Sequence, residues 1–264
     1  MNEERTNIIK IFCLWSAVFV LTRIFFLHSP YHGEPDMDLM SSGIYYNVLS
    51  GKGLSGDFLY GKSFSYGYYF IVFKALAAFP ALMRNLEGFL YLITFVSSLL
   101  TIFFVIKLFS GLKRSKLNLN IFLALWILSP VWWECTTYSH PIVPAIAALL
   151  AGSLALKKGF GITGRSKASI YFALSALLFF VSFSLRSEVM LLVPGVFLLS
   201  AEFRDRGRIV SSIASILIAV VIFFVVQAHL IPAGEAAANG LADRAAPISL
   251  SLITNFLGKF ASAG

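Results

Sequence analysis

The segment Gly88–Phe109 reads GFLYLITFVSSLLTIFFVIKLF, and it decides the fold class. Its single charged residue is Lys107, close to its end. A helix needs roughly 20 apolar residues to cross about 30 Å of hydrocarbon, and this run is long enough. In lipid every backbone N–H and C=O group must be paired inside the protein, which a helix achieves within one segment. The segment therefore predicts a transmembrane helix.

The rest of the chain repeats this pattern. Its 264 residues are 58% hydrophobic and 13% charged, whereas soluble globular domains are about 25% charged. Pro130, Pro141 and Pro144 disfavour one continuous helix from 119 to 156. We therefore expect an all-α polytopic membrane protein, a single module over 1–264 with seven spans. The predicted spans are Ile8–His28, Gly88–Phe109, Leu119–Trp132, Tyr138–Leu156, Ala168–Leu185, Val189–Phe203 and Ile209–Leu230.

The first apolar run is too long for a signal-peptide core, and no small-residue cleavage site follows it. It is therefore expected to stay as the first span. Cys13 and Cys135 lie in or beside apolar runs, and two such cysteines have neither a disulfide framework nor a metal-ligand spacing. We interpret both as small hydrophobic residues.

Basic residues predict the orientation. Ten of the 21 lysines and arginines lie in the gaps 110–118, 157–167 and 202–208. A further apolar segment, 66–83, is interrupted by Lys74. If that segment is an amphipathic helix along the outer interface, all three gaps fall on the cytoplasmic side; if it spans, all three fall outside. The positive-inside rule favours the first arrangement. We expect a plasma or inner membrane protein with a cytoplasmic N-terminus.

The net charge of +8 is explained by this topology. No aromatic–basic face typical of a nucleic-acid reader accompanies it, so membrane lipids and not nucleic acid are the expected partners. The outward segments are then 29–87, 133–138 and 231–264. The first is longer than a connector needs, which is typical of functional loops. The last is mildly apolar at 248–260, without a polar tail, so we expect a truncated or short chain.

The first outward segment opens with Glu34-Pro35-Asp36-Met37-Asp38. In an extended chain Asp36 and Asp38 point to the same face. Such a pair can hold one divalent cation, Mg²⁺ or Mn²⁺, or one member can act as a general base on an incoming hydroxyl. The alternative is a solvated acidic loop, and residue chemistry alone leaves both open. His28 and His32 nearby do not have the spacing of a zinc site.

The order of features in this loop resembles the GT-C superfamily of lipid-phospho-sugar-dependent glycosyltransferases, above all its protein O-mannosyltransferase and aminoarabinose-transferase branch. That family has seven spans before a second long outer loop. Its first loop has an acidic residue or pair, an aromatic-containing helix, a Gly-x-Gly-like turn and a juxtamembrane helix. The corresponding segments here are Glu34–Asp38, Ile44–Leu49, Gly51–Gly53 and Tyr66–Met83.

Two departures qualify the match. The family often has an adjacent Asp-Glu pair, whereas these acids alternate with other residues, so the catalytic carboxylate stays open between Asp36 and Asp38. Typical members are also longer, which implies a missing C-terminal region or a partner subunit. The resemblance implies transfer of a sugar from a polyprenyl-phosphate donor to a lipid, glycan or protein acceptor, with inversion. One Asp would deprotonate the acceptor while cations stabilise the leaving lipid phosphate.

Further residues are candidates for substrate binding. Arg186, at the turn between the fifth and sixth spans, can grip a phosphate bidentately or pair with Glu188. Arg23, inside the first span, is costly in lipid and so is either functional or snorkels to water. Lys62 and Lys74 can meet lipid phosphate or headgroups, and Glu34 adjoins the aspartates.

A last group surrounds the outer mouth of the third and fourth spans. Glu134, Tyr138 and His140 can bind sugar hydroxyls or assist proton transfer, although the neighbouring Trp132-Trp133 pair is also typical of an interfacial aromatic belt. A transporter or flippase is the alternative function, because Pro-broken helices also occur there, but the chain has no repeated halves. A non-catalytic scaffold subunit is the third interpretation.

Overall fold

The computed structural model describes residues 2–23, 65–110, 116–137, 140–162, 164–200 and 206–230. Within these ranges the chain is helical and contains no strand, which confirms the all-α fold class. The helices are α1 (Asn2–Arg23), α4 (Tyr66–Ala78), η2 (Pro80–Asn85), α5 (Leu86–Ser110), α6 (Lys116–Ile127), α7 (Pro130–Thr137), α8 (Ile142–Gly161), α9 (Arg165–Leu185), η3 (Ser187–Leu192), α10 (Val193–Ser200) and α11 (Arg206–Leu230); those written η are 3₁₀ helices.

Five of the described helices, α1, α5, α8, α9 and α11, are each long and apolar enough to cross a membrane. The pair α6 and α7 meets the same criterion together, as one span bent by 57°. These six match predicted spans. The remaining prediction, 189–203, corresponds to η3 and α10, which form a shorter apolar helix. The chain is thus a polytopic membrane protein, with a bent span and a short apolar helix where two full spans were predicted.

The bend has a local cause. Pro130 has no N–H to donate, and its ring clashes with a continuing helix. The α6 ladder therefore ends with the Leu128 and Ser129 N–H groups bonded to the Ala124 and Trp126 carbonyls. The chain then restarts as α7 in a new direction. The Ile127 carbonyl lies at this break, where α6 itself supplies it with no i+4 partner.

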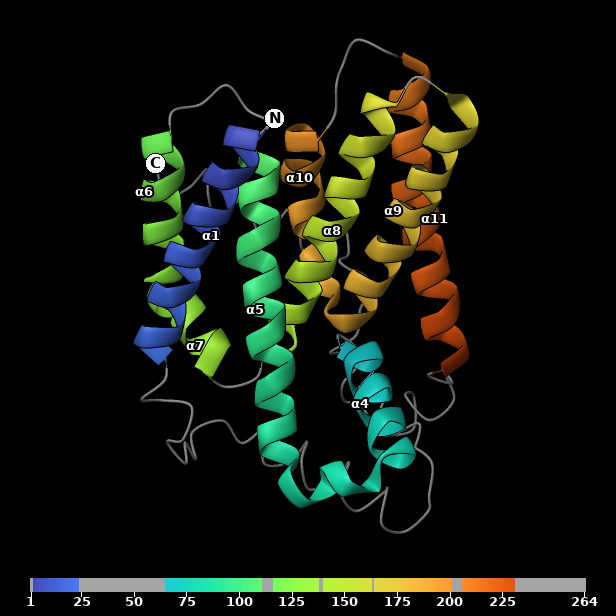
Figure 1. Cartoon of the computed structure of the whole chain (residues 1–264). Coiled ribbons are helices and arrows are strands. Elements are labelled where there is room, and N and C mark those ends of the chain that lie inside the picture. The colour runs from blue at the N-terminus through green and yellow to red at the C-terminus, as the bar shows by residue number, and fades with distance from the viewer. Residues whose placement is uncertain are drawn as a thin grey trace, which may run out of the picture.

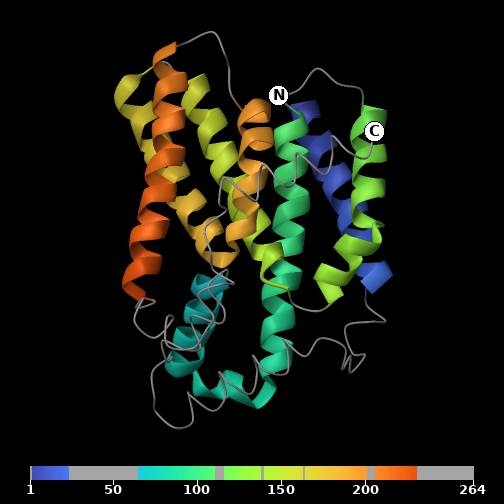
Figure 2. The ribbon, with the colours of Figure 1, turned by 180° about the vertical axis from the view of Figure 1, so that it is seen from behind.

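The helices define two ends of the bundle (Figure 1). At one end, here called the basic end, α1, α6, α9 and α11 begin and α5, α8 and α10 finish. The helix ends that flank the three basic gaps therefore share this end with the start of α1. This agrees with the grouping expected from charge. At the opposite end, the loop end, α1, α9 and α11 finish and α8 begins. The views in Figures 1 and 2 agree that α4 and η2 project beyond this end.

The centre of the fold is the contact between α8 and α9. Ala145, Gly152 and Gly159 recur every seven residues on α8, which allows the two backbones to approach closely. A Cβ atom on Gly152 would lie 2.9 Å from the Phe179 ring. Across this contact Ser175 donates to the Gly152 carbonyl (2.9 Å) and Ser182 to the Ala145 carbonyl (2.8 Å). Small residues and hydroxyl donors thus hold this pair together.

The segment predicted as an outer helix, 66–83, forms α4 and part of η2, outside the set of spans. Its face with Tyr68, Tyr69 and Val72 is buried in one cluster with α8 and α9 residues. The opposite face exposes Phe70 and Ile71. The prediction of an amphipathic helix therefore needs a correction, because both faces carry apolar side chains. The acidic segment 34–38 and the segment 231–264 lie outside the described residues.

Candidate functional site

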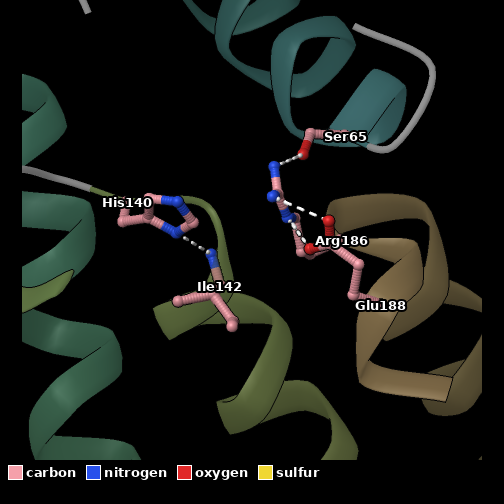
Figure 3. Close-up of polar contacts among 5 residues, drawn as sticks. All are labelled: Ser65, His140, Ile142, Arg186 and Glu188. Atoms are coloured by element: carbon pink, nitrogen blue, oxygen red, sulfur yellow. Dashed lines mark hydrogen bonds and ion pairs between the residues drawn. The ribbon is translucent and has the colours of Figure 1, made fainter. Parts of the chain in front are cut away.

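The strongest candidate site at the loop end is built around Arg186, between α9 and η3. Its backbone N–H donates to the Ser182 carbonyl (3.0 Å) and ends α9. Its side chain pairs with Glu188 through Nε and Oε2 and through Nη2 and Oε1 (2.9 Å). The third contact runs from Nη1 to the Ser65 hydroxyl (3.2 Å), directly before α4. Figure 3 shows the guanidinium held between these partners.

This geometry leaves donor capacity on Arg186. A guanidinium has five N–H donors, and the contacts to Glu188 and Ser65 use three of them within the described residues. The arginine side chain is 26% exposed and that of Glu188 is 45% exposed. An ion pair this exposed contributes only about 0–1 kcal/mol to stability. Arg186 is therefore oriented by its partners and still accessible to an anion.

Gly67 brings α4 onto this site. A Cβ atom at that position would lie 2.6 Å from the Ser184 Cβ and 2.8 Å from the Ser184 carbonyl oxygen. The backbone of α4 therefore packs directly on the last turn of α9, two residues from Arg186. Ser65 is 2% exposed, so its contact with Arg186 is shielded from solvent. The first outward segment is in this way joined to the loop end at its α4 side.

His140 lies at the same end, before α8. Its Nδ1 accepts a hydrogen bond from the Ile142 N–H (3.2 Å), the first donor of α8. A neutral imidazole that accepts at Nδ1 carries its proton on Nε2. Its backbone N–H donates to the Cys135 carbonyl (3.3 Å) and links α7 to α8. In Figure 3 the His140 ring and Arg186 lie on two sides of the start of α8, below α4.

Glu134 is on α7 and is exposed. Within the described residues no hydrogen bond or ion pair joins it to Arg186 or His140, so the structure brings together Arg186, Ser65 and Glu188 but not Glu134. Lys74 is exposed on α4, with its Nζ 5.5 Å from the centre of the Phe70 ring. The other predicted residues lie outside the described ranges; they are Glu34, Asp36, Asp38, Lys62 and Tyr138.

Arg23 is the last residue of α1 and is fully buried, so it does not snorkel to water. Its Nη2 donates to the Ile127 carbonyl (2.5 Å) and its Nε to the Thr136 hydroxyl (3.3 Å). The guanidinium carbon lies 4.9 Å from the centre of the Phe19 ring and 4.8 Å from that of Trp133. Arg23 thus donates to the Ile127 carbonyl, which the break between α6 and α7 leaves without an intrahelical partner.

The physical effect of these contacts is to tie α1 to the bent span. A cation near the C-terminus of a helix is favoured by the helix dipole, and aromatic faces attract a desolvated guanidinium by about 2 kcal/mol. These contacts are those of a structural anchor. No described contact connects Arg23 with Arg186.

Sequence reasoning missed Ser65 and Gly67. Ser65 precedes an apolar helix, which is a signal for an N-cap, but its hydroxyl makes no cap hydrogen bond and instead accepts from Arg186. The need for glycine at 67 depends on a neighbour more than 100 residues away and has no local signal. Thr136 was also missed, because its partner Arg23 is 113 residues away in the sequence.

Metal ligands were predicted at Asp36 and Asp38, which the structure does not describe. Among the residues that it does describe, no group of three or more His, Cys, Asp or Glu side chains is placed to hold a metal ion. Comparison of the chain with protein-family models, curated proteins and solved structures gives no match.

Proposed function

We propose that this chain is a glycosyltransferase module of the GT-C type, which transfers a sugar from a polyprenyl-phosphate donor to a lipid, glycan or protein acceptor. The observation that supports it best is the join between Arg186, Ser65 and α4. Both described neighbours of the acidic segment, the end of α1 and the start of α4, lie at the loop end (Figure 1). The described residues on both sides of the acidic loop are therefore at the end of the bundle that holds Arg186.

Arg186 is the proposed phosphate ligand. Among the described residues, its contacts with Glu188 and Ser65 use three of its five N–H donors, and guanidinium binds phosphate oxygens in a paired geometry. The donor's polyprenyl chain would stay in lipid while its phosphate meets the exposed side of Arg186. His140, beside the start of α8, is a proposed contact for a sugar hydroxyl. Glu134 and Tyr138 are proposed as outer contacts, and Lys62 and Glu34 as loop contacts.

The proposed reaction is a displacement at the anomeric carbon. The acceptor oxygen or nitrogen forms a bond to that carbon, the bond to the phosphate oxygen breaks, and the configuration inverts. The acceptor's proton moves to Asp36 or Asp38, and the polyprenyl phosphate leaves with the electron pair. General-base assistance typically contributes 10²- to 10⁴-fold. Arg186 would stabilise the negative charge on the leaving phosphate, and a divalent cation on the aspartates would add to it.

The test uses membranes that contain the full chain and are supplied with a radiolabelled polyprenyl-phosphate sugar. Asp36→Asn combined with Asp38→Asn is expected to abolish transfer to endogenous acceptors, and the single variants identify the base. Asp57→Asn, in the same loop, is the matched control and should transfer normally. Transfer by the double variant at the wild-type rate would refute the proposal.

The orientation is part of this proposal. The positive-inside rule assigns the basic end to the cytoplasm and the loop end to the outside of a plasma or inner membrane. After Cys13→Ala and Cys135→Ala, a cysteine at Asp57 should react with an impermeant thiol reagent in intact cells, while one at Lys116 should not. The opposite labelling pattern would reverse the topology and place Arg186 on the wrong face.

One observation favours a transporter as the second candidate. The bent pair α6–α7 is a broken span, and broken spans in transporters expose carbonyls that coordinate ions. Here the Ile127 carbonyl at the break accepts from Arg23, so this donor already occupies the position of an ion. Uptake of a polyprenyl-phosphate sugar into proteoliposomes without transfer of the sugar would favour a flippase. A non-catalytic scaffold subunit predicts neither uptake nor transfer.

A further inference from the structure

A groove of about 570 Å³ runs between α9 and α11, at one edge of the bundle (Figures 1 and 2). Phe172 and Ala176 of α9 and Ser215 of α11 form its buried floor, while Leu177 and Ile218 form exposed walls. It lies within two helices that are long and apolar enough to span. In a membrane its open side therefore faces hydrocarbon.

Small residues create this groove. Ala173, Ala176 and Ala214 line it where larger side chains would fill it. The two serines that α11 contributes are compatible with an apolar occupant, because their hydroxyls donate within α11 itself. Ser215 donates to the Ser211 carbonyl (2.9 Å), and Ser211 donates to the Gly207 carbonyl (3.0 Å). These two hydroxyls therefore need no hydrogen-bond acceptor from the occupant of the groove.

The groove can enclose an extended hydrocarbon chain but not a whole helix. The lining runs from Ser169 to Phe180 on α9, which is about 18 Å of helix. Dividing about 570 Å³ by this length gives a mean cross-section of about 32 Å². A helix with side chains is about 10 Å across and needs roughly 80 Å². An extended acyl chain is much thinner than a helix, so it is the better fit.

The mouth of the groove at the basic end is positively charged. Lys167 is exposed two residues before the lining begins, and Arg208 stands near the start of α11. Lys158 lies 5.8 Å from the centre of the Tyr171 ring, at the same end. The gaps 157–167 and 202–208 hold seven basic and two acidic residues. Basic pockets between spans favour anionic headgroups.

We propose that this groove binds one anionic phospholipid from the leaflet at the basic end. One acyl chain lies between α9 and α11, and the headgroup phosphate meets Lys167 and Arg208. Charge complementarity at the mouth selects an anionic over a zwitterionic lipid. The site lies at the opposite end of the bundle from Arg186, so it is independent of the proposed transferase chemistry.

The test uses the full chain in phosphatidylcholine vesicles with a trace of phosphatidylglycerol that carries a photoreactive diazirine on one acyl chain. After illumination, labelled peptides are mapped by mass spectrometry. Labels should concentrate on 172–180 and 214–222. They should exceed those from a diazirine phosphatidylcholine by about thirtyfold, as two basic groups near a headgroup predict. Equal labelling by both probes, or labels spread evenly over all spans, would overturn the proposal.

Two variants separate the headgroup contact from the chain contact. Lys167→Gln with Arg208→Gln should remove the preference for phosphatidylglycerol while groove labelling by either probe persists. Ala176→Phe should fill the floor and reduce labelling by both probes. Arg84→Gln, at an exposed basic residue of η2 beyond the loop end, is the matched control and should label like wild type. Wild-type labelling of Ala176→Phe would refute the site.

A second copy of the chain is the competing occupant. A cysteine at Leu177, in the Cys13→Ala and Cys135→Ala background, would form a disulfide-linked dimer if α9 faced its counterpart. We expect it to stay monomeric in vesicles. Efficient dimer formation would replace the lipid by a protein interface. Unchanged thermal unfolding of each variant checks that the fold is retained.

Discussion

Arg23 and Arg186 both lie where a span finishes at the loop end of the bundle, yet their surroundings differ. Arg23 is fully buried, and its acceptors are a carbonyl, two hydroxyls and two aromatic faces. Arg186 is 26% exposed and pairs with a carboxylate. All contacts of the Arg23 guanidinium are with the helices around it, whereas Arg186 has two N–H donors beyond its partners among the described residues.

This difference in burial and partners distinguishes a structural cation from a candidate ligand site. Near a membrane both residues look functional in the sequence, because charge there is costly. The cost of burying Arg23 is offset by its hydrogen bond to the Ile127 carbonyl at the helix break. Loss of Arg23 should therefore lower stability first. The exposed one contributes little to stability, so its loss should affect ligand binding first. The four predictions below can break this contrast.

The largest expected effect is that of Arg186→Gln on the proposed sugar transfer. Removing one positioned donor to a developing oxyanion typically lowers the rate about 10²-fold or more, while the melting temperature should stay close to wild type. Sugar transfer and thermal unfolding measured on the same preparation check both parts. Glu188→Gln, which removes the ion pair but keeps the guanidinium, should retain transfer. An equal drop in both variants would make Arg186 a positioning residue only.

Arg23→Met should show the reverse pattern, with a loss of stability of about 3 kcal/mol, because the buried Ile127 carbonyl and Thr136 hydroxyl lose a donor. All four tryptophans lie in α1, α6 and α7, so their fluorescence reports this region during thermal unfolding. Lys10→Met, an exposed site on the same helix, is the control. A melting curve for Arg23→Met that overlays the control would show that the anchor is dispensable.

Gly67→Ala should cost about 2 kcal/mol, because the added Cβ overpacks against the backbone of α9. Part of this cost can be relieved if α4 moves away, in which case transfer falls although the spans stay folded. Gly161→Ala is the matched control, since a Cβ there meets nothing within 4 Å. Tyrosine emission and transfer activity are the readouts. Normal behaviour of both variants would contradict the tight docking of α4.

Thr136→Val is the finest test of the Arg23 anchor. It removes one hydroxyl acceptor and keeps the shape of the side chain. Hydrogen bonds between membrane helices average about 0.6 kcal/mol, so we expect a loss of that size. Thermal unfolding of Thr136→Val, Arg23→Met and the double variant gives the coupling between the two residues. Additive losses would mean that the 3.3 Å contact contributes nothing.

The sequence by itself determined the parts of the fold that depend on composition. Gly88–Phe109 had to be a helix that spans, because an apolar run in lipid must pair its backbone groups internally. Pro130 was expected to interrupt the helix from 119, and the structure bends there. The helix ends that flank the three basic gaps share one end of the bundle, as charge predicted. These features follow from properties of contiguous segments.

The tertiary structure alone decided which polar residues meet. Arg23 and Thr136 are 113 residues apart, and Arg186 and Ser65 are 121 residues apart. Nothing in the neighbourhood of Ser65 or Gly67 predicts the last turn of α9 as a partner. Such contacts arise because packing of close backbones depends on the shapes of both surfaces at once. A pattern along one segment reports its own burial and period, but the partner that buries it is chosen only when the helices assemble.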